Sequence, residues 1–472
     1  MEPGKAVCNI PSEGAYRVDI NGWHYLKLKG SPGQIGRDHG YLLADQILLV
    51  VSRMSKLIYI QTGTEWTFFK EHVMKEWAGK FPIMKEWEDE MKGIVEGVNC
   101  AIADKQLSYE PLEYADILVW NAYEELVDYW FPNVAHEVYQ NMGNSNAKTF
   151  KEFHHGAQDH CSAFIATGSY TRDGAIVIAH NSFSPFEEGG FVNVVLDIEP
   201  EHGNNIIMQA QPGYIHSFTD YYGNSAGLVI TETTIGGFNA YDETQIPEFF
   251  RARRAAQYAS SLKEFIDYIW EGNNGGYANT WLVGDTKTNE IMRLELGLKF
   301  YKDDYTMDGY FAGFNAPLDP RIRNFECENS GFADIRRHQG ARQVRIPQLM
   351  EQYKGQIDDE IAQKILADHY DVYLQKDNPC SRTICSHYEL DDRAFMSQTG
   401  RPGPFTPRGA VDGVCATAAD AKAMRFWGRF GSSCGCAFDA KKYFAQHPQF
   451  DYLSEFIDDR PSQPWTCFPP ER

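Results

Sequence analysis

Two apolar runs separated by a turn stand out in the middle of the chain. The first, Cys161–Ala166, follows a polar, histidine-rich stretch, and the second is Ala175–Ala179. Between them, Arg172-Asp173-Gly174 has the composition of a tight hairpin turn. Short apolar runs bounded by turn residues are typical of β-strands. We therefore expect a β-hairpin in which Cys161 opens the first strand and His180-Asn181 closes the second.

After a short strand-containing stretch over residues 1 to about 30, the apolar positions before residue 160 recur mainly at helical spacing. Ser31-Pro32 supplies an N-cap and a first-turn proline, and further helical patterns run over about 65–103 and 112–130. After Cys161 short strand-like runs dominate, over 192–198, 206–209, 228–231, 280–283 and 291–296. Helical patterns return over 247–270, 340–373 and 417–428. This order favours an α+β protein with two sheets between helical layers.

A change in composition suggests how the chain is divided. From Pro132 to His160 the helical pattern gives way to Asn, Gly, Lys and His. We interpret 141–160 as an exposed linker, where a chain is readily processed. The expected organisation is a helical N-terminal segment, 1–160, followed by a catalytic unit, 161–472, with helices covering its C-terminal part.

Cys161 is a candidate nucleophile because it begins an apolar strand directly after the linker. A thiol attacks as the thiolate and needs a nearby base. If the peptide bond between His160 and Cys161 is cut, the new α-amine has a pKa of about 8 and can act as that base. We therefore predict cleavage at this bond. The alternative is a buried core cysteine, a common environment for a free thiol.

Several motifs resemble known families. Cys161-Ser162-Ala163, Ile178–Phe183 and Thr231–Gly236 resemble the phospholipase B-like proteins. The stretch Tyr25–Ile47 is similar to the start of the penicillin acyltransferase-like autoproteolytic family. Both families are N-terminal nucleophile hydrolases, so the resemblance implies a four-layer αββα sandwich with extra helices.

The resemblance also implies roles for single residues. His180 and Asn181 would lie at the site, where His180 could orient the thiol or share in proton transfer. Asn279, within Tyr277–Trp281, would donate its side-chain amide to the tetrahedral oxyanion. The structural alternatives are a hydrogen-bonded pair for His180-Asn181 and a turn residue for Asn279.

The sequence gives several candidates for the residues that contact the substrate. Thr233 follows an apolar strand and could bind substrate or polarise a carbonyl group, or simply cover the strand end. Asp220 is a second candidate. An arginine could hold a carboxylate or phosphate, but the sequence does not distinguish among the candidates Arg251, Arg253, Arg254, Arg336, Arg337, Arg342 and Arg345.

The charge and the ends of the chain limit the expected partners. A formal net charge of -21 disfavours nucleic acid and anionic membrane surfaces. No apolar run reaches transmembrane length, Met1–Lys5 does not lead into a signal-peptide core, and no N-x-S/T sequon occurs. These features predict a cytoplasmic protein.

Ten cysteines in a chain of 472 residues do not indicate a disulfide scaffold. Cys380, Cys385 and His387 lie close together, and Cys434-Gly435-Cys436 is a C-x-C pair. Neither spacing is standard for zinc ligands. We expect reduced structural thiols with no metal and no cofactor, with zinc binding or one disulfide as alternatives.

The sequence thus predicts an autoprocessing hydrolase that cleaves or transfers an acyl group through a thioester. Its expected partner is a small-molecule acyl substrate from the amide or ester class. The two fragments should stay associated because the N-terminal helices have apolar faces that need covering, and homo-oligomerisation is left open. The alternatives are a phospholipase B-like lipid acyl hydrolase and a non-catalytic binding protein that keeps the fold.

Overall fold

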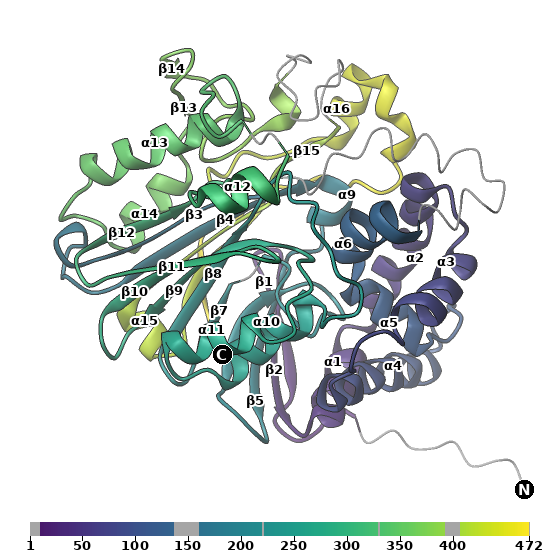
Figure 1. Cartoon of the computed structure of the whole chain (residues 1–472). Coiled ribbons are helices and arrows are strands. Elements are labelled where there is room, and N and C mark those ends of the chain that lie inside the picture. The colour runs from purple at the N-terminus through teal and green to yellow at the C-terminus, as the bar shows by residue number, and fades with distance from the viewer. Residues whose placement is uncertain (1–9, 136–159, 220, 329–330, 392–405, 472) are drawn as a thin grey trace, which may run out of the picture.

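A computed structural model describes residues 10–135, 160–219, 221–328, 331–391 and 406–471 (Figure 1). Within these residues two large sheets form the centre of the molecule. The first has nine strands in the order β1 (Tyr16–Ile20), β2 (Trp23–Gly30), β5 (Val194–Pro200), β6 (Ile206–Ala210), β7 (Tyr222–Asn224), β8 (Leu228–Thr234), β9 (Asn279–Asp285), β10 (Glu290–Leu296) and β11 (Tyr301–Thr306). Its neighbours are antiparallel except β2 and β5, which pair in parallel.

The second sheet has seven strands. Their order is β12 (Gly309–Gly313), β3 (Cys161–Thr167), β4 (Val177–Pro185), β16 (Asp412–Thr417), β17 (Phe426–Phe430) and β18 (Thr466–Phe468), while β15 (Arg408–Ala410) pairs with the end of β4. The inner faces of the two sheets share one apolar core, which includes Ile165 and Ile178 from one sheet and Val195 and Leu282 from the other.

Helices cover both outer faces of the sandwich. The helices α1 (Pro32–Leu42), α2 (Ala44–Thr62), α4 (Lys85–Lys105), α5 (Tyr114–Asn121), α10 (Glu248–Tyr258) and α11 (Leu262–Trp270) share a core with the nine-stranded sheet. The helices α13 (His338–Gln352) and α14 (Asp359–Leu366) pack on the seven-stranded sheet (Figure 1). The predicted α+β sandwich with αββα layers is therefore confirmed.

Shorter elements join these layers. The remaining helices are α3 (Trp66–His72), α6 (Tyr123–Glu125), α9 (Phe186–Gly189), α12 (Pro320–Phe325), α15 (Ala418–Lys422) and α16 (Ala440–Gln446), with π-helical η1 (Val73–Trp77) and η2 (Leu126–Ala135). The 3-10 turns are η3 (Gly168–Tyr170), η4 (Tyr388–Leu390) and η6 (Pro448–Leu453), and β13 (Tyr370–Asp371) pairs with β14 (Lys376–Asp377). Among the described helices, none combines the length and apolar character needed to cross a membrane.

The alternation of side chains along β3 explains why it is buried on both faces. Ala163 and Ile165 face the other sheet, while Phe164 and Ala166 face α13 and α14. A strand covered on both sides reads as a continuous apolar run, as this one does. Cys161 shares the inner face with Ala163 because the two residues are two positions apart.

Glycines allow α1 and α4 to pack with their backbones almost in contact. A Cβ atom added at Gly36 would lie 2.0 Å from the carbonyl oxygen of Glu90, and one at Gly97 would lie 2.1 Å from that of Arg37. A Cβ atom at Gly40 would lie 2.1 Å from the carbonyl oxygen of Ile94, and one at Gly93 would lie 2.5 Å from that of Gly33. Side chains at these positions would force the helices apart.

Most predicted elements are confirmed, with three corrections. The strands expected before about residue 30 are β1 and β2, which complete one end of the nine-stranded sheet; the predicted boundary at residue 160 stays a prediction. β4 continues past Asn181 to Pro185. The helix predicted over 417–428 ends early, because Met424 adopts a positive φ of 52° and β17 follows. Reduced thiols were expected, but Cys100 is disulfide-bonded.

Candidate active site

Cys161 lies at the first position of β3 with its side chain between the two sheets. It is 1% exposed. Its Sγ atom is 3.6 Å from Oε1 of Glu232 in β8, and its main-chain N–H donates a hydrogen bond to Oδ1 of Asn315 at 3.1 Å. A thiol, a carboxylate and a fixed amide oxygen therefore meet where the two sheets face each other.

Arg342 and Asn315 hold the backbone of Cys161 from the other side. The Arg342 guanidinium, on α13, donates to the main-chain carbonyl oxygen of Cys161 and, at 2.9 Å, to Asn315 Oδ1. Asn315 Nδ2 donates to the carbonyl oxygen of Thr234 at 2.7 Å. Because Nδ2 must face that carbonyl, Oδ1 is left to accept from both Cys161 and Arg342. The main-chain N–H and C=O of Cys161 are thus both fixed.

His180 completes the inner-face group. The register places it opposite Ala163 in β3, and one of its ring nitrogens lies within 4.8 Å of both Cys161 Sγ and a Glu232 carboxylate oxygen. The side chain is fully buried, and burial lowers its pKa to about 3. A neutral imidazole can orient a thiol, but it is a poor proton acceptor near neutral pH.

Asn181 lies on the opposite face of β4 and is separated from the thiol. It pairs with Ser162, so its side chain faces the outer helical layer. Its Nδ2 donates to the carbonyl oxygens of Leu366 at 3.1 Å and Ile384 at 3.2 Å, and contacts Ser433 Oγ at 3.1 Å. The structure therefore does not bring the predicted pair His180-Asn181 together at Cys161, because adjacent strand residues face opposite sides.

The remaining predicted residues lie on the nine-stranded sheet or outside the described part. Asn279 opens β9 opposite Thr234, and within the described residues neither atom of its buried amide has a hydrogen-bond partner. Thr233 packs against Gly313 of β12, where an added Cβ would lie 2.4 Å from the threonine Oγ1. Asp220 lies outside the described residues.

His160 precedes the candidate nucleophile and is itself buried. Its carbonyl oxygen accepts a hydrogen bond from the main-chain N–H of Phe183, and its Nδ1 lies 3.1 Å from the Phe183 carbonyl oxygen. The centre of its ring is 6.5 Å from the ring centres of both Phe218 and Tyr277. These two rings belong to a cavity, so the predicted cleavage site borders it.

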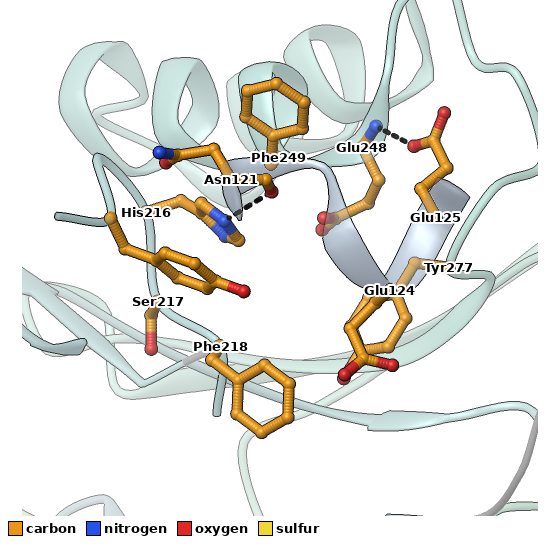
Figure 2. A pocket seen from close by; sticks show the side chains of 10 residues that line it. Asn121, Glu124, Glu125, His216, Ser217, Phe218, Glu248, Phe249 and Tyr277 are labelled. Carbon is orange, nitrogen blue, oxygen red and sulfur yellow. Dashed lines mark hydrogen bonds between the residues drawn. The ribbon is translucent and has the colours of Figure 1, made fainter. Parts of the chain in front are cut away.

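The cavity is small, with an accessible volume of about 20 Å³, and combines aromatic, acidic and amide side chains (Figure 2). The lining residues are Asn121, Glu124, Glu125, Tyr214, His216, Ser217, Phe218, Glu248, Phe249 and Tyr277. In Figure 2 the labelled side chains surround a common space, with the carboxyl groups of Glu124 and Glu248 on one side of it and the His216 ring opposite. A cavity of this volume has room for about one water molecule.

Burial raises the pKa of the acids that line this cavity. Burial raises the pKa of Glu248 to about 8, with the charge of Glu125 adding to the increase and Arg251 opposing it. Burial and the nearby charge of Glu188 raise the pKa of Glu124 well above its ordinary value. The cavity therefore carries less negative charge near neutral pH than its composition suggests.

Three residues of the site were not identified from the sequence. Glu232 lies within the Thr231–Gly236 motif, but only Thr233 was selected there. Asn315 lies two residues after the end of β12, and a polar residue near the end of a strand was the available signal. Arg342 was one of seven candidate arginines, and only the packing of α13 against β3 distinguishes it.

The described residues thus form an αββα sandwich with a buried cysteine at the start of β3. Residues 52–459 match the family model Phospholipase B, and the chain belongs to the Phospholipase B family. It is 24% identical over 432 residues to Phospholipase B of Crotalus adamanteus, covering 80% of this chain and 75% of the relative. It is 25% identical over 284 residues to Phospholipase B-like 1 of Homo sapiens, covering 52% and 48%. It is also 22% identical over 301 residues to an uncharacterized protein of Archaeoglobus fulgidus, covering 58% and 43%.

Proposed function

We propose that this protein is a lipid acyl hydrolase in which Cys161 is the nucleophile. Membership of the Phospholipase B family and the printed names of the relatives support a lipid ester as substrate. The assignment of Cys161 as the nucleophile rests on the contacts that surround it. Its Sγ lies 3.6 Å from Glu232, and its backbone is fixed by Asn315 and Arg342.

The proposed reaction has two steps. The Cys161 thiolate attacks the carbonyl carbon of the acyl ester, the ester C–O bond breaks, and the alcohol leaves with a proton. The resulting thioester is then attacked by water, which releases the fatty acid and restores the thiol.

A finer proposal concerns how the nucleophile arises. The Cys161 thiol attacks the carbonyl carbon of His160, moving the acyl group from nitrogen to sulfur, and water then opens the thioester between the two residues. The His160 carbonyl oxygen already accepts a hydrogen bond from the Phe183 N–H. A backbone donor at this position stabilises the oxygen as it becomes negative. The products are a carboxylate on His160 and a free α-amine on Cys161.

The free α-amine is a better base than His180. Burial lowers the His180 pKa to about 3, whereas an unperturbed α-amine titrates at about 8. Asn315 Oδ1 already accepts the hydrogen bond of the Cys161 nitrogen, so it can orient the amine. The positive charge of Arg342 nearby favours the neutral amine, which is the form that accepts a proton.

The test compares Cys161→Ala with wild type and with Cys467→Ser, a half-buried cysteine at the sheet edge. Intact mass and release of fatty acid from phosphatidylcholine in detergent micelles are measured. Wild type and Cys467→Ser should give fragments of 160 and 312 residues (472 minus 160), with the larger beginning Cys-Ser-Ala-Phe-Ile. Cys161→Ala should remain one chain and release no fatty acid.

The two levels of the proposal fail separately. Fatty acid release by purified Cys161→Ala would remove Cys161 as the nucleophile. An active wild-type protein that remains a single chain would keep the thiol mechanism but exclude the α-amine as base. Turnover of an N-acyl amide without turnover of phosphatidylcholine would replace the lipid ester with an amide substrate.

A further inference from the structure

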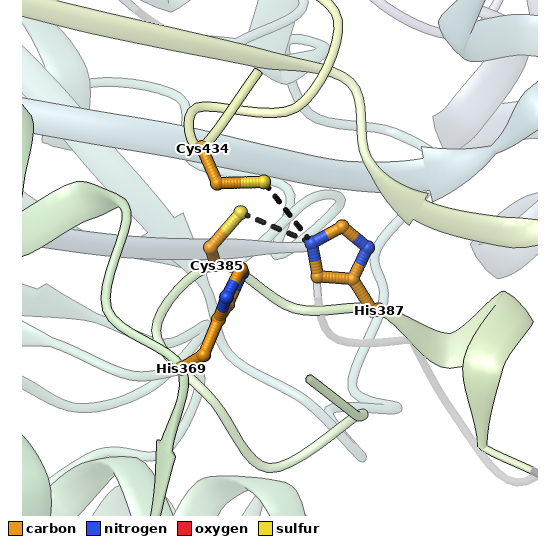
Figure 3. A group of neighbouring side chains, drawn as sticks. All are labelled: His369, Cys385, His387 and Cys434. Atoms are coloured by element: carbon orange, nitrogen blue, oxygen red, sulfur yellow. Dashed lines mark hydrogen bonds between the residues drawn. The ribbon is translucent and has the colours of Figure 1, made fainter. Parts of the chain in front are cut away.

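A second group of reactive side chains lies near the outer face of β4, apart from Cys161. His369, Cys385, His387 and Cys434 converge so that one nitrogen or sulfur atom of each lies within 4.8 Å of the others (Figure 3). In Figure 3 both sulfur atoms point toward the His387 ring. The four residues come from three loops: after α14, before η4 and after β17.

The spacing of the atoms fits a tetrahedral metal site. Cys385 Sγ is 3.4 Å and Cys434 Sγ is 3.5 Å from the same nitrogen, Nε2 of His387. Ligands bound to zinc at about 2.3 Å for sulfur and about 2.0 Å for nitrogen lie roughly 3.5 Å apart. The buried Nε2 of His369 has no hydrogen-bond partner within the described residues. Small side-chain movements would bring all four atoms onto one ion.

The surroundings of the group match those of a structural metal site. His387 Nδ1 is 2.7 Å from Glu389 Oε1, and a carboxylate on the distal nitrogen fixes the ring of a metal-bound histidine. Cys385 and His387 are almost fully buried. The three loops are also joined behind the group, because Asn181 bonds to Leu366, Ile384 and Ser433.

We propose that His369, Cys385, His387 and Cys434 bind one zinc ion that ties these three loops to the outer face of β4. Four protein ligands complete a tetrahedral shell, so the site is structural rather than catalytic. Deprotonated thiols and neutral imidazoles are the forms that bind the metal, and binding displaces the thiol protons.

This proposal replaces the expectation of no metal. The sequence placed Cys380, Cys385, His387, Cys434 and Cys436 together as candidates. In the structure the Sγ atom of Cys380 lies 3.6 Å from Oδ2 of Asp371, and Cys436 is exposed. His369 takes part instead, sixteen residues before Cys385, and this spacing is not that of a standard zinc motif.

The experiment measures metal content of the full chain purified without chelators. One zinc per chain is expected, and after removal of zinc under reducing conditions Co²⁺ should give the visible bands of a tetrahedral thiolate site. Cys434→Ser and His369→Gln should lose both signals. Cys380→Ser is the matched control, a buried cysteine from the same loop, and should keep both. Glu389→Gln should keep the site but weaken Co²⁺ binding roughly 10-fold to 100-fold.

Three outcomes overturn the proposal. Wild-type protein that carries no zinc and gives no Co²⁺ bands after reduction excludes the site without any variant. A Cys385–Cys434 disulfide in the unreduced peptide map assigns the two thiols to a covalent crosslink. Zinc retained equally by Cys434→Ser shows that the metal binds elsewhere. None of these readouts depends on activity, so the lipid hydrolase proposal is tested separately.

Discussion

Asn279 has a side-chain amide whose hydrogen bonding the fold does not satisfy. Its amide is fully buried, and neither amide atom has a hydrogen-bond partner within the described residues. Leaving a buried polar group unsatisfied costs about 1–3 kcal/mol. The amide is therefore available to a bound group, in keeping with the donor role that the family resemblance implies.

Replacing Asn279 with Ala should lower kcat roughly 100-fold to 1000-fold and leave KM within a few-fold, because an oxyanion donor acts mainly in the transition state. Steady-state kinetics on a phospholipid substrate measure both constants. Asn324→Ala, at an exposed position, is the control and should behave as wild type. A rise in KM alone would make Asn279 a substrate-binding residue.

At this scale the sequence identified Cys161 but not the residues that fix it. Cys161 and His180 lie in motifs close to each other in the chain, so a hairpin brings them together. Asn315 and Arg342 reach Cys161 from β12 and α13, 154 and 181 residues away. Contacts over such separations depend on how sheets and helices pack, which residue patterns alone do not specify.

β4 is the element that divides the two sites of this molecule. Its inner face carries His180 toward Cys161, and its outer face carries Asn181 toward the loops of the proposed zinc site. The sequence predicted the strand but ended it at Asn181, because the apolar run gives way there to the polar pair His180-Asn181. Ser182, Phe183 and Ser184 are buried and continue the strand as the partner of β3 and β15, so the end of the apolar run gave the wrong boundary.

Replacing Asn181 with Ala should lower the free energy of unfolding by about 1–3 kcal/mol, since two buried carbonyl groups lose a donor. Turnover of the folded variant should stay within a few-fold of wild type. Urea denaturation and initial rates measure the two effects. Loss of turnover without loss of stability would return Asn181 to the catalytic group.

On the scale of the whole molecule, part of the formal negative charge belongs to buried acids whose pKa is raised. The chain has a formal charge of -21, yet burial raises the pKa of several acids around the cavity. For Glu248 the folded pKa is about 8 against an ordinary value of 4.5. Between these pH values Glu248 binds more protons in the folded than in the unfolded state, so its own contribution to stability falls as the pH rises.

Glu248 should therefore lower the urea midpoint as the pH rises from about 5 to 8, and the difference in midpoint between wild type and Glu248→Gln should change across this range. The upper limit for the difference is about 1.4 kcal/mol for each unit of pKa shift. Glu110→Gln, an exposed substitution, should not change the pH dependence. Equal pH dependence in wild type and Glu248→Gln would mean that Glu248 is ionised in the folded protein.

The parallel pairing of β2 with β5 has a consequence for whether the proposed enzyme can refold after cleavage. Residues 24–30 hydrogen-bond with residues 194–200, so the bond after His160 lies between two strands of one sheet. If that bond is cut, the sheet consists of two polypeptides, and each contains only part of the sequence that specifies the fold. The cleaved protein would then be stable while folded but would not refold once unfolded. Two separate chains would have to associate before the sheet could form. Maturation would be irreversible in folding as well as in covalent structure.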